Sequence, residues 1–77
     1  MSNTIKQKLE TKIWELEEAE TNSQEEIYLM DCLKIILLAK SYTRENLEHK
    51  AANLKAIKFR NEKQNCLLDA LNDLLTS

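Results

Sequence analysis

The chain has 77 residues, a mass of 9.0 kDa and a formal net charge of −2, and it contains neither glycine nor proline. Without glycine it cannot build a Walker-type phosphate loop, a G-x-G-x-x-G dinucleotide turn or a G-x-S-x-G nucleophile elbow, because each needs backbone conformations that only glycine adopts at low cost. Three large classes of enzyme are thereby excluded. Hydrophobic residues make up 43% of the chain and charged residues 31%, which is typical of a folded domain rather than a disordered segment.

The small size and the two cysteines bound the protein further. A chain this short buries only about 60% of the surface that its unfolded state exposes, and oligomerisation is a common way to add stability. Cys32 and Cys66 lie far apart in the sequence and show no metal-ligand spacing. We expect two buried, reduced thiols in a cytoplasmic protein, with a disulfide as the alternative.

Neither a signal peptide nor a membrane span is predicted. The first twenty residues mix lysine and glutamate through every turn and contain no apolar segment of the kind that signal peptides have. The apolar run over residues 27–39 contains Asp31 and Lys34 and is shorter than the roughly 20 residues that cross a bilayer. We therefore expect a soluble protein of the bacterial cytoplasm, or of the host cytoplasm if the chain is encoded by a phage.

A first helix is predicted over about residues 4–20. Ile5, Leu9, Ile13 and Leu16 follow one another at intervals of four, four and three residues, which places all four on one helix face. The opposite face consists of lysine, glutamine and glutamate. This pattern is typical of a helix with one side on a hydrophobic core.

A second helix is predicted over about residues 24–40. Ser23 and Glu26 form a capping-box pattern at its start, in which each side chain accepts a hydrogen bond from the other residue's backbone N–H. The helix is apolar on nearly all sides, with only a narrow polar stripe through Asp31 and Lys34. Such a helix needs cover on several sides. We expect it to be the central helix and to contact a second chain as well.

The remaining residues, 44–75, allow two interpretations. Thr43 is a suitable N-cap, and nothing in the composition interrupts a helix from there to Leu75. At about 100° per residue, however, the apolar face changes sides along this segment. The segment either continues as one long helix or breaks near Asn61, where Asn61 and Gln64 form a possible cap pair. The two apolar groups are Leu47, Ala51 and Leu54, and Leu67, Ala70, Leu71 and Leu74.

We favour the continuous helix slightly, because no loop-forming residue accompanies the break. The predicted fold is all-α, a single domain over residues 1–77 built as a small bundle of three helices. In the alternative, the long third helix breaks near Asn61 into two helices over residues 44–60 and 61–75. In the continuous form the C-terminal half carries an exposed apolar face that needs a partner. We expect the protein to be oligomeric.

Charge is distributed unevenly along the chain. Residues 15–31 contain seven acidic residues and no basic ones, whereas residues 34–63 contain eight basic residues and three acidic ones. A basic helix face in the second segment would suit phosphate groups. The pI near 5.4 argues against a dedicated nucleic-acid binder, so we favour a solvated face that pairs with the acidic first turn of the second helix. The candidate phosphate contacts are Lys50, Lys55, Lys58, Arg60 and Lys63.

Catalysis and metal binding are not expected. His49 is the only histidine, and no cysteine or carboxylate stands near it in a pattern that ligates a metal or activates a nucleophile. A small bundle without long loops also offers little pocket for acid–base chemistry. We predict no enzyme activity, no cofactor, no metal and no small-molecule ligand.

The sequence predicts a protein–protein interaction module, such as a small adaptor, a chaperone, an antitoxin or a phage-type inhibitor. Its partner would be a second copy (a homodimer or higher oligomer) or another helical protein, bound through an exposed apolar helix face or the outer side of the second helix. A nucleic-acid-associated regulator that uses the basic face of residues 50–63 is the alternative, and no membrane contact is expected. The candidate partner-binding residues are Phe59, Leu67, Leu71, Leu74 and Leu75.

Overall fold

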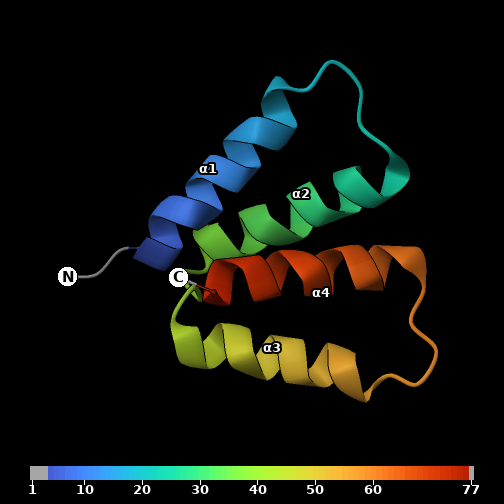
Figure 1. Ribbon diagram of the computed structural model, residues 1–77. Coiled ribbons are helices and arrows are strands. Elements are labelled where there is room, and N and C mark those ends of the chain that lie inside the picture. The colour runs from blue at the N-terminus through green and yellow to red at the C-terminus, as the bar shows by residue number, and fades with distance from the viewer. Residues whose placement is uncertain (1–3, 77) are drawn as a thin grey trace.

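The computed structural model describes residues 4–76 and folds them into four α-helices (Figure 1). The described residues contain no strand, so the prediction of an all-α bundle is confirmed. The preference for one continuous helix over residues 44–75 is wrong, because the chain leaves its third helix and reverses before the fourth. The helices are α1 (Thr4–Glu18), α2 (Gln24–Leu38), α3 (Arg44–Ala56) and α4 (Glu62–Leu75).

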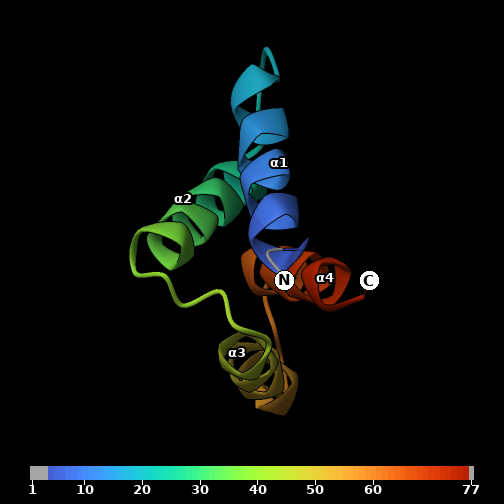
Figure 2. The ribbon, with the colours of Figure 1, turned by 90° about the vertical axis from the view of Figure 1, so that its left-hand side faces the viewer.

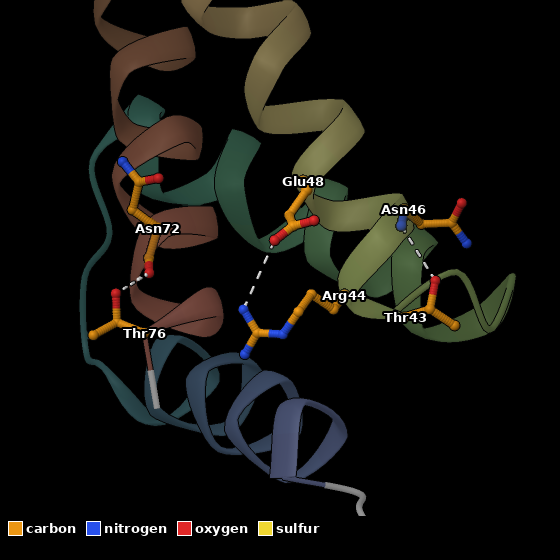
Figure 3. A network of polar contacts seen from close by, with 6 residues as sticks. All are labelled: Thr43, Arg44, Asn46, Glu48, Asn72 and Thr76. Carbon is orange, nitrogen blue, oxygen red and sulfur yellow. Dashed lines mark hydrogen bonds and ion pairs between the residues drawn. The ribbon is translucent and has the colours of Figure 1, made fainter.

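Polar caps start α2 and α3 at the residues that the sequence predicts. The Ser23 hydroxyl accepts a hydrogen bond from the Glu26 N–H at 3.2 Å, and the Glu26 carboxylate accepts one from the Ser23 N–H at 2.8 Å. At α3 the Thr43 hydroxyl accepts from the Asn46 N–H at 3.2 Å (Figure 3). These contacts satisfy N–H groups that have no partner within the helix.

The break between α3 and α4 is made by a second capping box. The Asn61 side chain accepts from the Gln64 N–H at 2.8 Å, and the Gln64 side chain accepts from the Asn61 N–H at 3.0 Å. Because these bonds replace the helical ones at the start of α4, the chain can reverse here without glycine or proline. The reversal also brings the apolar face of α4 onto the bundle, whereas a continuous helix would leave that face in water.

The end of α2 explains why this helix stops at Leu38 rather than near residue 40. Lys40 adopts the left-handed conformation, with φ of 57°. The Lys40 N–H donates to the Leu37 carbonyl, and the Ser41 N–H donates to the Ile36 carbonyl, both at 3.1 Å. This pair of bonds is the Schellman motif, which usually has glycine at the left-handed position. In a glycine-free chain a lysine occupies it.

The central helix of the bundle is α4 rather than α2. It packs against α1, α2 and α3, and Figure 2 shows it nearly end-on among them. The expectation of a central α2 is wrong. After the chain reverses, α4 packs against all three other helices, and α2 has only one side on the bundle. The buried core is formed by Leu9, Ile13 and Leu16 of α1, Leu29, Leu33 and Ile36 of α2, Leu47 and Ala51 of α3, and Leu68, Ala70, Leu71 and Leu74 of α4.

The N-terminal half of α1 and the last turn of α4 meet at one end of the bundle. The Lys8 ammonium group donates to the backbone carbonyl of Asp73 at 3.2 Å and also to that of Thr76. A cation at this position is favourable, because the C-terminus of a helix carries partial negative charge and unpaired carbonyls. In the same turn the Thr76 hydroxyl donates to the Asn72 carbonyl at 2.8 Å (Figure 3).

Candidate protein-interaction surface

The side of α2 that faces away from the core is also apolar. Ile27, Ile35 and Leu38 are 44%, 65% and 83% exposed. At about 100° per residue they lie on one side of the helix, together with Asp31 and Lys34 and nearly opposite the buried leucines. We call this set of five residues the α2 outer face.

An ion pair joins the α2 outer face to α1. The Lys34 ammonium group lies 2.8 Å from a carboxylate oxygen of Glu17, and both side chains are about half exposed. The contact with Glu17, helped by the nearby charge of Asp31, raises the pKa of Lys34. The contact places the positive charge of Lys34 on a surface that otherwise carries apolar side chains and the acidic Asp31.

Trp14 on α1 is a further exposed large apolar side chain. It stands one turn before Glu17, on the same side of α1, and it is largely exposed. Trp14, Ile27, Ile35 and Leu38 are not among the partner-binding residues predicted from the sequence. The polar stripe of Asp31 and Lys34 could have indicated the exposed residues of α2. That stripe marks the solvent side of the helix, and the apolar residues next to it lie on the same side.

The candidate partner-binding leucines of α4 lie in the core instead of on an exposed face. Leu71 is fully buried and Leu74 nearly so, while Leu67 and Leu75 are half-buried against the same core. The expected exposed face is absent because α4 folds back over the bundle. A partner could contact Leu71 or Leu74 only if α4 first separated from its neighbours.

Phe59, by contrast, is 87% exposed in the loop between α3 and α4. The loop is held by Arg60, whose guanidinium group donates to the carbonyl oxygens of Leu54, Lys55 and Ile57 at 3.2–3.4 Å and to the side chain of Asn65 at 2.8 Å. Arg60 thus ties the end of α3 to the start of α4. This network leaves Phe59 outside the bundle, with the Lys58 ammonium group 5.9 Å from the centre of its ring.

The five candidate phosphate contacts do not share one helix face. Lys50 and Lys55 are on α3, but they flank its buried side about 140° apart. Lys58 and Arg60 belong to the loop because α3 ends at Ala56, and Lys63 on α4 lies 5.8 Å from the ring centre of Tyr28. Arg60 is engaged in the loop hydrogen bonds. No ion pair among residues 4–76 connects this basic group with the first turn of α2, so the expected internal pairing is absent.

The cysteines and His49 form no cluster. Cys32 and Cys66 are half-buried free thiols, and His49 is exposed. Partial burial raises the pKa of Cys66, with Lys12 acting in the opposite direction, and a hydrogen bond with Cys32 raises the pKa of Tyr28. In the described part of the chain no group of three or more histidine, cysteine or acidic side chains is placed to hold a metal ion.

A shallow groove of about 570 Å³ runs between α1 and the end of α4. Lys8 and Lys12 line it together with Glu15 and Asp73, so its charges are mixed, and the Lys8 ammonium group is engaged with the α4 carbonyls. The groove therefore favours no particular class of ligand. No helix within residues 4–76 is long and apolar enough to cross a membrane.

No protein-family model matches the chain. No curated protein and no solved structure matches it either. Within residues 4–76, three of the five exposed large hydrophobic side chains, Ile27, Ile35 and Leu38, lie on the α2 outer face.

Proposed function

We propose that the protein is a non-enzymatic protein–protein interaction module that binds its partner through the α2 outer face. The observation that carries this proposal is the exposure of Ile35 and Leu38 on a helix whose opposite side is already buried. Scattered exposed hydrophobic residues are normal, but several on one side of one helix are typical of a binding surface. Burying one such side chain contributes about 1.5–3 kcal/mol.

The charged residues of the α2 outer face support the same role. Asp31 and Lys34 lie between Ile27 on one side and Leu38 on the other, so the surface has two apolar ends and a charged middle. Apolar contacts supply most of the affinity in such an arrangement, and the charges select orientation and partner. A small adaptor, a chaperone, an antitoxin or a phage-type inhibitor would bind in this way.

Site-specific photo-cross-linking in cells tests the proposal without knowledge of the partner. We would replace Ile35 with p-benzoylphenylalanine and, as a matched control, replace Asn53, which is exposed on α3. The expected result is an adduct of discrete mass from position 35 and none from position 53. Equal labelling at both positions, or no adduct from position 35, would contradict the proposal.

Contact with single-stranded nucleic acid through the α3–α4 loop is the second candidate function. It is favoured by the exposure of Phe59 beside Lys58, since aromatic rings stack on bases at about 1–3 kcal/mol per base and lysines contact phosphates. Fluorescence anisotropy with a labelled oligonucleotide tests it. We expect binding that weakens steeply with salt and is reduced by Phe59→Ala, and an absence of binding at low salt would exclude this function.

A further inference from the structure

We infer that the occupant of the α2 outer face is a second copy of this chain, paired through α2 as an antiparallel helix around a two-fold axis. This inference rests on the proposed function, because it names the partner of the same surface. Three properties of the described residues support it: the spacing of the face, the order of its charges and the ion pair at its edge.

The spacing is that of a helix-pairing seam. Ile27, Asp31, Lys34 and Leu38 follow one another at intervals of four, three and four residues, and at about 100° per residue they form a stripe only about 60° wide. This is the spacing of residues that meet along two paired helices. The stripe lies opposite the buried side of α2, so a second helix can reach it without displacing the core.

Two copies of the stripe are complementary to each other when they run in opposite directions. A two-fold axis midway between residues 32 and 33 places Ile27 opposite Leu38 of the second copy and Asp31 opposite its Lys34. Both apolar ends then meet apolar residues, and both acidic residues meet basic ones. A parallel arrangement would instead place Asp31 against Asp31 and Lys34 against Lys34, which is repulsive. The pattern therefore favours the antiparallel pair and provides the self-complementary contact that two-fold symmetry requires.

The ion pair between Lys34 and Glu17 positions the basic partner. Because Glu17 holds the Lys34 ammonium group at the edge of the face, this cation stays on the α1 side of α2. Asp31 of the second copy would then approach a lysine whose side chain is already ordered. Less side-chain freedom is lost on pairing than for a free lysine. Ile35 lies beside the stripe on α2 and would be partly covered by the second helix.

Two charge-reversal variants test the pairing through their mixture. In Asp31→Lys alone, the two lysines of one chain face the two lysines of the other, and in Lys34→Glu alone, the two carboxylates of one chain face the two carboxylates of the other. We expect each variant alone to be mostly monomeric at a concentration where the natural chain is dimeric. Mixed in equal amounts, the two variants should regain the mass of a dimer, because the new lysine of one chain then faces the new glutamate of the other. Sedimentation equilibrium measures the mass, and circular dichroism checks that each variant is folded.

Cysteine cross-linking tests the same register without changing charge. Ile27→Cys and Leu38→Cys would each be made in a Cys32→Ser/Cys66→Ser background. The antiparallel pair predicts a disulfide-linked dimer in the mixture of the two variants and little in either variant alone. A parallel pair would link each variant to itself.

The outcomes separate the inference from the proposed function. If the charge-reversal mixture stays monomeric, or if the single variants remain dimeric, the antiparallel α2 pair is overturned. If the natural chain is monomeric at every concentration but the photo-cross-linker at Ile35 captures one different protein, self-pairing fails and the proposed function stands. If the chain is monomeric and position 35 captures nothing, both fail.

Discussion

The ammonium group of Lys34 lies 2.8 Å from the carboxylate of Glu17, and this contact joins α2 to α1 beside the exposed Ile35 and Leu38. An exposed ion pair of this kind contributes little to stability. Its importance lies in its position, because it fixes a cation on a surface that otherwise consists of apolar side chains and Asp31. The charge that orients a partner is thereby ordered before binding.

Leu71→Ala and Leu38→Ala should differ strongly in their effect on folding. Leu71 is fully buried in α4, so removing its side chain is expected to lower the free energy of unfolding by about 2–5 kcal/mol. The same substitution at the exposed Leu38 should change it by less than about 0.5 kcal/mol in the monomer. Urea unfolding followed by circular dichroism measures both. Similar losses for the two variants would mean that α4 is not the central helix.

The capping box of α4 predicts unequal effects of two asparagine substitutions. Asn61→Ala removes the side chain that accepts the Gln64 N–H, and it should cost about 1 kcal/mol. Asn53→Ala, on the exposed side of α3, should be neutral or slightly stabilising because alanine favours helix. Thermal unfolding of the two variants side by side measures the difference. A stable Asn61→Ala protein would argue against the break at this residue.

Lys40→Gly should stabilise the protein. Lys40 has φ of 57°, a conformation in which the side chain of a non-glycine residue crowds the backbone, and glycine relieves this at some cost in unfolded-state entropy. We expect a net gain of about 0.5–1 kcal/mol in chemical unfolding. Lys40→Ala is the control, since it removes the charge and keeps the crowding. Stabilisation by alanine equal to that by glycine would show that charge, rather than backbone conformation, is responsible.

The thiol of Cys66 should react slowly at mildly alkaline pH. Its pKa is raised because partial burial disfavours the thiolate, so a larger rise in pH is needed to form the reactive species. Alkylation rates of the Cys32→Ser variant across a pH series should therefore have their midpoint above the ordinary thiol value. The same measurement in denaturing urea should return the ordinary midpoint, and identical midpoints in both states would contradict the assigned burial.

The same shift has a consequence for stability. The pKa of Cys66 is higher in the folded state than in the unfolded state. The contribution of the Cys66 thiol to the free energy of unfolding is therefore fully present below the unfolded-state pKa, and it is lost as the pH rises through the folded-state pKa. Cys66→Ser should remove this part of the alkaline loss of stability.

The caps and the helix count show how far local sequence signals reach. The sequence predicts caps at Ser23 and Thr43, and one at Asn61 in the alternative of a broken helix, because an N-cap depends on residues three positions apart; all three caps are present. The decision at Asn61 between a break and a continuous helix was wrong, because it depends on whether α4 finds an apolar surface to cover. That surface is built from α1, α2 and α3 together, and no local window contains it.

The candidate site likewise has some features that the sequence predicts and others that depend on the folded structure. The exposure of Phe59 and the polar stripe of α2 follow from neighbouring residues and could be inferred from the sequence. The burial of Leu71 and Leu74 could not, since the apolar face of α4 would lie in water on a continuous helix and is buried only because the chain folds back. The role of Arg60 in holding the loop likewise depends on the geometry of the α3 end, which the sequence does not specify.

Sedimentation equilibrium of the natural chain beside Leu38→Asp, over one series of protein concentrations, shows whether α2 pairs with itself. We expect the natural chain to move from the 9.0 kDa of one copy toward the mass of two as concentration rises, while Leu38→Asp stays at one copy with unchanged helicity. A dimer that persists in Leu38→Asp would show that another surface holds the two chains together. A natural chain that stays at the mass of one copy throughout would contradict the pairing of α2 with itself.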